Sequence, residues 1–254
     1  MARIISTVNA KGGVGKTTTA TNLGAYLAAF GKYVLVVDTD PQGNATTGLG
    51  AYLKDEHLNL YHTLVGDYEP DAIIRKTQLL GYDLLPAAPS LAGANVELVS
   101  VQEREFWLKN VLNKIRTNYD YIIIDSAPSL GLLPINTLVA SDGVIIPVQC
   151  EYYALEGLSQ LLNTIDLVRT SLNPNLQIYG VLLTMFDKRN MLSQQVASEV
   201  RQNFPGRVFE TVIPRSISLA AAPSYGKTIL QFDPDSRGAQ AYRQLAEEIL
   251  QLTS

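Results

Sequence analysis

Short apolar runs alternate with helical patterns along the whole chain. The runs are nearly continuous stretches of Val, Ile and Leu, which is typical of strands that are buried on both faces. We therefore predict an α/β fold, in which a mostly parallel, twisted sheet carries helices on both faces. The predicted strands are Ile4 to Val8, Val34 to Val37, Asp83 to Pro86, Tyr121 to Ile124, Val144 to Val148 and Tyr179 to Thr184, and a further short strand precedes Val212.

Helical patterns fill the intervals between these runs. Gln102 to Asn118 has an apolar stripe, which includes Trp107 and predicts an amphipathic helix packed on the sheet. For residues 51 to 80 we predict a mixed, mainly helical segment with loops. No linker rich in Pro, Gly or Ser interrupts the pattern, so we predict one domain over residues 1 to 254. Further helices are predicted over Thr19 to Phe30, Ala154 to Val168, Asn190 to Gln202 and Gly238 to Leu252.

The composition is that of an ordinary globular protein. Apolar residues make up 46% of the 254 residues, against 17% charged residues, which excludes a disordered chain. The formal net charge of -4 gives no global attraction to nucleic acid or membranes, so any such binding needs a local patch. The single cysteine, Cys150, is predicted to be a small buried apolar residue. His57 and His62 have no cysteine or carboxylate cluster around them and are predicted to be ordinary surface or loop residues.

Residues 10 to 18, Ala-Lys-Gly-Gly-Val-Gly-Lys-Thr-Thr, lie between the first predicted strand and the first predicted helix. Glycines in such a turn let backbone N–H groups surround phosphate oxygens, and the helix N-terminus adds partial positive charge. Lys16 is expected to bridge the outer phosphates, and the Thr17 hydroxyl to ligate magnesium. The segment has Ala10 where the general pattern has glycine, and it gains a second lysine, Lys11. Against the alternative of a turn without a ligand, we predict nucleotide contacts from Lys11, Gly12, Gly13, Val14, Gly15, Lys16, Thr17 and Thr18.

Acidic residues follow two predicted strands at their carboxyl ends, which is the edge where open α/β sheets bind ligands. Asp38 and Asp40 follow the second strand, in a loop suited to sensing an outer phosphate. Asp125 ends the run from Tyr121 to Ile124, which is the Walker B pattern, and is expected to hold magnesium directly or indirectly. A solvated turn explains either segment alone, but the phosphate-loop pattern favours a nucleotide site.

The stretch Lys-Gly-Gly-Val-Gly-Lys-Thr-Thr closely resembles the deviant Walker A motif of the ParA/MinD family of partition and positioning ATPases. The resemblance implies a single-domain P-loop fold that uses ATP and Mg²⁺, with Lys11 reaching across a dimer to the partner's nucleotide. It also implies that Asp40 positions or activates the attacking water and that Asp38 lies close to the magnesium. The implied catalytic residues are Lys11, Lys16 and Asp40, and the implied metal residues are Thr17, Asp38 and Asp125.

Two segments in the second half of the chain extend this resemblance. Residues 147 to 157 match the ParA branch closely, which implies a place near the dimer interface. Glu151 and Glu156 are candidates there for contacts across the dimer, with surface ion pairs as the alternative. The resemblance further implies that Pro214 and Ser216 flank the adenine, although the family usually has asparagine where this chain has Ser216.

A basic segment points to nucleic acid. Between positions 188 and 227 the chain has six basic and two acidic residues, a local excess of 6 − 2 = 4 positive charges. Such a patch binds phosphates without sequence preference, with a solvated basic face as the alternative. Arg189 matches a family position that contacts the DNA backbone, whereas Ser218 replaces a second expected arginine and Ala221 replaces a glutamate. We predict DNA contacts from Arg189, Lys188 and Arg215.

The resemblance covers nearly the whole chain and implies an ATP-dependent homodimer. This dimer is expected to bind DNA non-specifically and to be released when a ParB-like protein stimulates slow hydrolysis. The predicted function is plasmid or chromosome partitioning at the nucleoid, and the alternative is the positioning of a protein cargo by the same switch. Two metabolic uses of the same fold are disfavoured. An electron-donating iron protein needs two cluster cysteines per chain, and this chain has only Cys150. An amidotransferase is expected to need an appended glutaminase domain, for which 254 residues leave no length.

Membrane positioning of the MinD type is disfavoured. The C-terminal helix carries Glu247 and Glu248 and lacks the cationic face of a membrane-surface helix. The chain has no signal-peptide pattern and no apolar run near the ~18 residues that a membrane span needs. We therefore expect a cytoplasmic, nucleoid-associated protein without a membrane partner.

Overall fold

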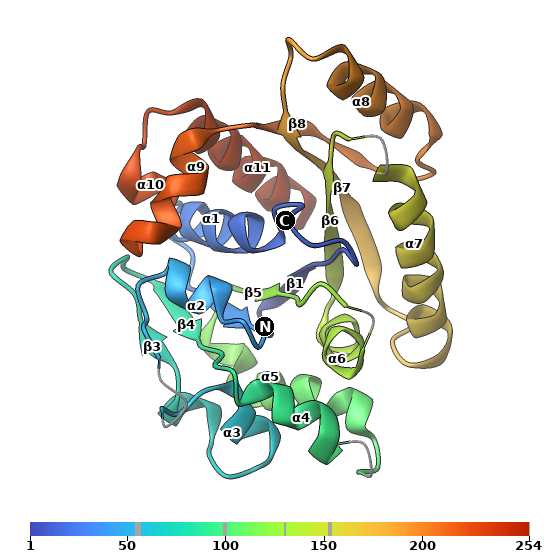
Figure 1. Cartoon of the computed structure of the whole chain (residues 1–254). Coiled ribbons are helices and arrows are strands. Elements are labelled where there is room, and N and C mark those ends of the chain that lie inside the picture. Colours follow the sequence, from blue (N-terminus) through green and yellow to red (C-terminus); the bar gives the residue numbers. More distant parts are fainter. Residues whose placement is uncertain (54–56, 99–100, 130, 152–153, 254) are drawn as a thin grey trace.

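The computed structural model describes residues 1–53, 57–98, 101–129, 131–151 and 154–253, and these fold around one sheet (Figure 1). Within them the sheet has eight strands in the order β3-β4-β2-β5-β1-β6-β7-β8. Neighbouring strands are parallel except β3 and β4, which are antiparallel. The strands are β1 (Arg3–Thr7), β2 (Val34–Asp38), β3 (Arg75–Lys76), β4 (Tyr82–Leu85), β5 (Tyr121–Asp125), β6 (Gly143–Gln149), β7 (Gln177–Phe186) and β8 (Val208–Pro214).

Helices cover both faces of this sheet (Figure 1), which confirms the predicted fold class. Ile5 and Val36 pack in one apolar cluster with α1 (Lys16–Ala29) and α11 (Arg237–Thr253). Their chain neighbours Ile4 and Val37 pack in another cluster, on the side of α5 (Trp107–Ile115) and α6 (Leu132–Ala140). Because successive strand residues point to opposite faces, continuous apolar runs are what two-sided burial requires. The remaining α-helices are α2 (Asn44–Gly48), α3 (Leu60–Leu64), α4 (Leu91–Glu97), α7 (Ala154–Ser171), α8 (Met191–Asn203), α9 (Ile217–Ala221) and α10 (Ile229–Phe232).

The described part of residues 51–80 is less helical than predicted. It contains only the five-residue α3, a 3₁₀ turn over Pro70–Ala72 and the short β3. Gly66, with φ of 89°, leaves the helical region soon after α3, so the helix is short and the later apolar positions of this segment, such as Ile73, lie outside it. His62 is also more than an ordinary surface residue: its Nδ1 accepts a hydrogen bond from the backbone N–H of Asn59 at 3.2 Å, which helps to cap α3.

Two other predicted boundaries are wrong. The helix expected over Gln102 to Asn118 is α5 flanked by 3₁₀ turns at Arg104–Phe106 and Arg116–Asn118, and Glu103 has a left-handed φ of 55° that breaks the helix. Val212 does not follow a strand but lies within β8. Trp107 packs partly buried against the core as expected. Cys150 is buried, and burial raises the pKa of its thiol to about 11.

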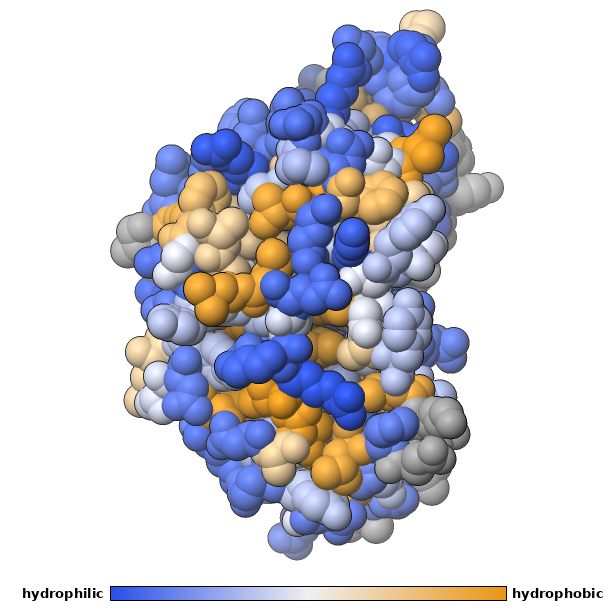
Figure 2. Space-filling view, turned by 90° about the vertical axis from the view of Figure 1, so that its left-hand side faces the viewer, coloured by the Kyte–Doolittle hydropathy of each residue, from blue (hydrophilic) through white to orange (hydrophobic). Residues whose placement is uncertain are grey.

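The two edges of the sheet are protected from pairing with another chain. At one edge, β3 is only two residues long and both are basic. At the other edge, the Glu248 carboxylate of α11 accepts hydrogen bonds from the backbone N–H groups of Glu210 and Thr211 at 3.1 and 2.8 Å. Figure 2, which shows the side of the molecule near β3, has apolar areas divided by hydrophilic ones. Across the described residues, every helix is too short or too polar to span a membrane.

Candidate nucleotide site

The predicted phosphate loop connects β1 to α1 at the carboxyl edge of the sheet (Figure 1). Gly13 and Gly15 have φ of 74° and 94°, left-handed values that favour glycine. A Cβ added to Gly12 or Gly13 meets no atom within 4 Å, so this side of the loop is open. Gly15 precedes α1 and no side chain caps the first N–H groups of that helix. The loop therefore offers backbone donors and the positive end of α1 to an anion.

Two side chains that we did not predict fix this loop in place. The Asn9 Oδ1 accepts a hydrogen bond from the backbone N–H of Lys11 at 3.0 Å, and its Nδ2 donates to the carbonyl of Pro147 at 2.8 Å. The Thr184 hydroxyl donates to the carbonyl of Val14 at 2.8 Å. Both anchors link the loop to the ends of β6 and β7, which are far from it in sequence. Sequence spacing alone gives no signal for such contacts.

The two lysines of the loop lie differently. Lys16 is only 6% exposed, and its Nζ donates a hydrogen bond to the carbonyl of Lys11 at 2.9 Å. Burial lowers the pKa of Lys16, while the negative charges of Asp125 and Asp40 oppose this shift. Lys11 instead has a side chain that is 44% exposed. The Lys16 side chain is thus bonded within the loop, whereas the Lys11 side chain is accessible from outside the subunit.

Asp125 is a fully buried carboxylate. It lies at the end of β5, opposite Asp38 of β2 and Thr7 of β1 in the strand register. Both of its oxygens are fully buried, and neither has a hydrogen-bond partner among the described residues. Burial raises the pKa of Asp125 well above its usual value, and the nearby charge of Asp38 adds to this effect. The nearby Lys16 ammonium lowers the pKa of Asp125 but does not offset these two causes, so the site favours a further positive charge.

Asp38 is occupied by the loop that follows it. Its Oδ1 accepts a hydrogen bond from the backbone N–H of Asp40 at 3.0 Å. Its Oδ2 accepts hydrogen bonds from the N–H and the hydroxyl of Thr46 at 2.8 and 2.7 Å. Burial nevertheless raises the pKa of Asp38 to about 6. These bonds hold Asp40, which is 7% exposed, near the phosphate loop, so Asp38 organises this segment whether or not it also lies beside a metal.

The donor set fits a magnesium ion. Asp125 offers two buried oxygens that accept no hydrogen bond from the described residues, and Thr17 lies in the first turn of α1. The described residues contain no cluster of three or more His, Cys, Asp or Glu that could enclose a metal. Magnesium does not need such a cluster, because it keeps several waters and is usually held by one or two protein groups together with substrate phosphates. The roles of Thr17, Asp38 and Asp125 toward the metal stay predictions.

The buried charge of Asp125 predicts a stability gain on its removal. In EDTA and without nucleotide at pH 8, we expect Asp125→Asn to raise the melting temperature by about 2–4 °C or more, because ~1 kcal/mol shifts a chain of this size by that amount. Because the pKa of Asp125 is raised well above its usual value, the folded state binds more protons than the unfolded state, and the cost of the Asp125 charge to wild-type stability grows as pH rises. The variant's advantage therefore shrinks at pH 5. Calorimetry at both pH values checks this, and equal melting at pH 8 contradicts it.

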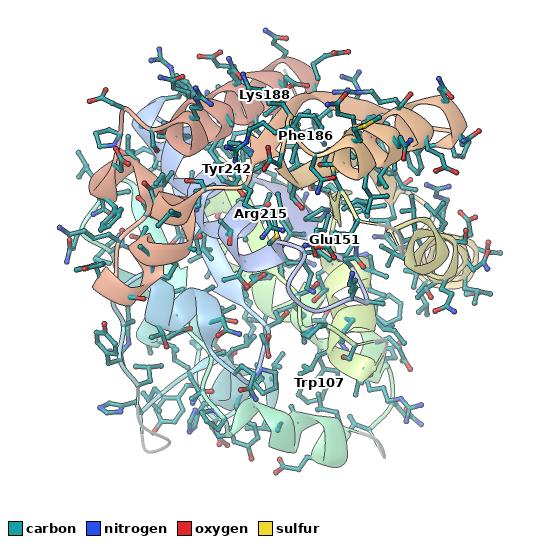
Figure 3. The ribbon with its side chains drawn as sticks, turned by 45° about the horizontal axis from the view of Figure 1, so that its top comes forward. Trp107, Glu151, Phe186, Lys188, Arg215 and Tyr242 are labelled. Carbon is teal, nitrogen blue, oxygen red and sulfur yellow. The ribbon has the colours of Figure 1, made fainter. Side chains whose placement is uncertain are left out.

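The residues predicted to contact adenine and DNA line one open groove of about 830 Å³. Pro214, Arg215 and Ser216 lie on one side of it and Lys188 and Arg189 on another, with α11 completing it. Figure 3 shows Lys188 above Arg215, toward the top of the molecule. Ser216 caps α9 by accepting a hydrogen bond from the Leu219 N–H at 3.3 Å. Its contact with adenine, like that of Pro214, stays a prediction.

The basic patch is weaker than the charge count indicated. Arg189 forms an ion pair with Asp187 at 3.3 Å, and Asp187 lies just outside the segment that was counted. Arg215 is paired with Glu151 at 3.7 Å, although that acid is distant in sequence. Glu151 also pairs with Lys11, at 3.7 Å. The side chain of Glu156 lies outside the described residues.

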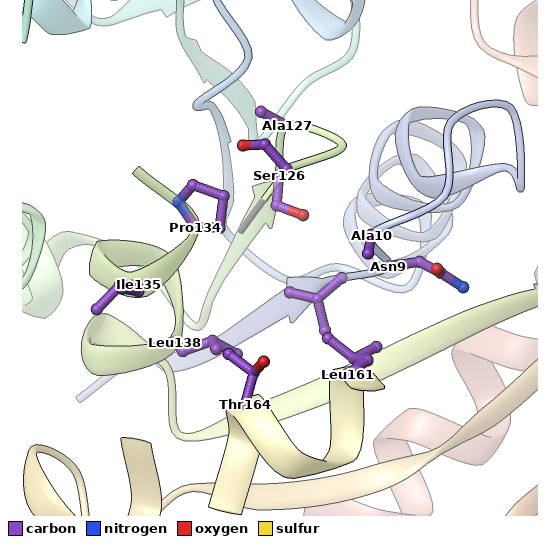
Figure 4. A pocket seen from close by; sticks show the side chains of 11 residues that line it. Asn9, Ala10, Ser126, Ala127, Pro134, Ile135, Leu138, Leu161 and Thr164 are labelled. Carbon is purple, nitrogen blue, oxygen red and sulfur yellow. The ribbon is translucent and has the colours of Figure 1, made fainter. Parts of the chain in front are cut away.

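A second pocket lies under the start of the phosphate loop (Figure 4). Asn9 and Ala10 line it together with Ser126 and Ala127, and residues of α6 and α7 close it. Its volume is about 10 Å³, which is room for roughly one water molecule. This pocket is therefore too small for a nucleotide.

Comparison with known proteins decides the family. A family model described as an AAA domain matches residues 2–178. The sporulation initiation inhibitor protein Soj of Bacillus subtilis is 57% identical over 249 residues, which cover 98% of each chain. The chromosome-partitioning ATPase Soj of Thermus thermophilus is 51% identical over 249 residues, covering 98% of this chain and 95% of the relative. The chain belongs to the ParA/Soj family. The predicted resemblance to ParA and MinD is confirmed.

Solved structures agree with this ParA/Soj assignment. A Mycobacterium smegmatis structure titled cobyrinic acid a,c-diamide synthase, with bound ADP and magnesium, has a TM-score of 0.88 and 39% identity, and the match covers 99% of this chain and 95% of that one. The cell division ATPase MinD of Pyrococcus furiosus has a TM-score of 0.80 and 27% identity over 99% of this chain and 100% of that one.

Proposed function

We propose that this chain is an ATPase switch for chromosome or plasmid partitioning that dimerises when ATP is bound and acts in the cytoplasm at the nucleoid. The observation that supports it best is the contrast between the two lysines of the loop. Lys16 is buried and bonded within the loop, whereas the side chain of Lys11 is 44% exposed on its outer side. The exposed side chain of Lys11, unlike that of Lys16, makes no hydrogen bond within the described phosphate loop. It is suited to reaching the nucleotide of another subunit.

The reaction that we propose is the hydrolysis of ATP to ADP and phosphate. Backbone N–H groups of residues 12–18 and the Lys16 ammonium hold the phosphates and stabilise the charge that develops in the transition state. Magnesium, held by Thr17 and Asp125, supplies further positive charge when it is bound. The Asp40 carboxylate orients the attacking water and accepts its proton. Lys11 of the partner adds charge only in the dimer, which couples dimerisation to catalysis.

We propose that the ATP-bound dimer binds DNA through Lys188, Arg189 and Arg215. Three contacts per subunit, and six in a dimer, predict that affinity falls about 10³-fold between 50 and 200 mM salt. In a gel shift with random-sequence duplex, ATP but not ADP is expected to support binding. Arg189→Ala should lower affinity for every sequence and flatten the salt dependence.

The matched control for this experiment is Arg243→Ala. Arg243 is an exposed arginine of α11 that is paired with Glu247, so it offers the same loss of charge outside the groove. Its affinity should stay near that of wild type. Equal binding with ADP and ATP, or binding that is insensitive to salt, contradicts the DNA proposal.

We propose a ParB-like protein as the partner that stimulates hydrolysis. The chromosome-partitioning proteins among the relatives support DNA rather than a protein assembly as the cargo. The test adds the purified product of the neighbouring gene to an ATPase assay with and without DNA. Stimulation by a helix-turn-helix protein that binds DNA supports chromosome or plasmid partitioning. Stimulation only by a protein without DNA affinity favours the positioning of a protein cargo.

A further inference from the structure

Glu151 lies just beyond the end of β6 and is shared between two cations from distant parts of the chain. Its Oε2 lies 3.7 Å from the Lys11 Nζ, and its Oε1 lies 3.7 Å from an Arg215 Nη2. The side-chain amide of Gln149 donates a hydrogen bond to the same Oε1. Figure 3 shows Glu151 and Arg215 as neighbours near the centre of the molecule. The carboxylate thus joins the phosphate loop to the groove beyond β8.

The backbone of Lys11 is fixed while its side chain is not. Its N–H donates to Asn9 at 3.0 Å, and its carbonyl accepts from the Lys16 Nζ at 2.9 Å. Movement of Lys11 toward another subunit is therefore confined to its flexible four-carbon stem. In the isolated subunit the one acid recorded in an ion pair with its ammonium, among the described residues, is Glu151.

We propose that Glu151 is an inhibitory clasp that holds Lys11 within its own subunit until a nucleotide of the partner subunit displaces it. This inference rests on the proposed function, because it assumes that Lys11 acts across the dimer. In this proposal the Lys11 ammonium leaves Glu151 to reach the partner's phosphates, so dimerisation competes with the pair. A triphosphate carries more negative charge than one carboxylate, which lets ATP succeed in this competition. Arg215 weakens the clasp because it draws on the same carboxylate.

Two variants should shift dimerisation in opposite directions. Glu151→Gln removes the charge but keeps the shape, and we expect it to dimerise at about two- to five-fold lower concentration of a non-hydrolysable ATP analogue, the range that half-exposed ion pairs provide. Arg215→Gln removes the cation that competes with Lys11 for Glu151. This variant should therefore require a higher concentration of the analogue to dimerise. The double variant should behave as Glu151→Gln, since Arg215 acts through Glu151. Light scattering without DNA measures all four proteins, and the differences should fade at 0.5 M salt.

The matched control is Glu247→Gln, which makes the same charge change at a half-exposed acid on α11. It should dimerise as wild type does. If Glu151→Gln needs as much analogue as wild type, or more, the clasp is wrong. If the wild-type protein itself does not dimerise with the analogue, the proposed function fails instead.

A second measurement tests the clasp without nucleotide. An amine-acylating reagent is applied to the nucleotide-free subunit, and the modification of Lys11 is followed by mass spectrometry with the exposed Lys188 as internal reference. We expect Lys11 to react about two- to five-fold faster in Glu151→Gln and more slowly in Arg215→Gln. This comparison remains valid where a variant binds nucleotide poorly or where the subunit never dimerises. Equal rates in wild type and Glu151→Gln overturn the inference.

Discussion

Lys11→Ala will abolish ATP-dependent dimerisation while the isolated subunit still binds nucleotide. Lys11 does not hold the loop together through its side chain, because the contacts to Asn9 and Lys16 use its backbone atoms. The variant therefore keeps the loop but loses the ammonium that is proposed to reach the partner's phosphates. Light scattering with a non-hydrolysable ATP analogue and Mg²⁺ should show the mass doubling for wild type and not for the variant.

Lys16→Ala is the matched comparison, since it removes the other lysine of the same loop. Lys16 is buried and lies inside the loop, so its loss should abolish nucleotide binding itself as well as dimerisation. Titration with a fluorescent nucleotide separates the two variants. If Lys11→Ala doubles in mass as readily as wild type, its proposed role across the dimer is wrong.

Asp40→Ala will slow ATP hydrolysis by about 10²-fold or more, and the dimer will persist. Asp40 is 7% exposed, and its carboxylate Oδ1 accepts a hydrogen bond from the Gln42 N–H at 3.0 Å. A carboxylate that orients and deprotonates water typically contributes 10²–10⁴-fold to a rate. Because phosphate binding is assigned to other groups, the variant should still dimerise and should stay dimeric for longer. Phosphate release and the lifetime of the dimer after dilution measure the two effects.

Asp40→Asn provides the control for shape, since it keeps a side chain that can accept the Gln42 hydrogen bond. It should be nearly as slow as Asp40→Ala, because the amide cannot take a proton. Recovery of most of the rate in Asp40→Asn means that Asp40 only positions the loop. A rate for Asp40→Ala within a few-fold of wild type removes Asp40 from the chemistry.

The apolar pattern of the sequence predicted the central strands of the sheet well, and it predicted the edge strand β3 and residues 51–80 poorly. Buried parallel strands such as β1 and β5 are continuous apolar runs, so they are visible in the sequence. β3 consists of two basic residues and forms because it pairs with β4. A local apolar pattern gives no sign of such pairing. The described part of residues 51–80 divides its buried apolar positions between the five-residue α3 and the segments around it, and such short pieces show no clear period.

The same distinction holds within the candidate site. The phosphate loop, Asp38 and Asp125 lie at strand ends, so their grouping follows from the parallel sheet. Asn9, Thr184 and Glu151 act through contacts between segments that are remote in sequence, and no spacing predicts them. The hydrogen bond from the Thr46 hydroxyl to Asp38 likewise forms because α2 places Thr46 beside the end of β2. The motifs thus predicted the candidate site, and only the fold showed which contacts hold its residues in place.

The central claim is that two subunits close around their nucleotides because each donates Lys11 to the other. A crystal structure with a non-hydrolysable ATP analogue and Mg²⁺ tests it most directly. We predict a dimer in which the Lys11 ammonium has left Glu151 and contacts the phosphates bound by the partner subunit. A nucleotide-bound dimer in which Lys11 still pairs with Glu151 of its own chain, or points into solvent, contradicts the account.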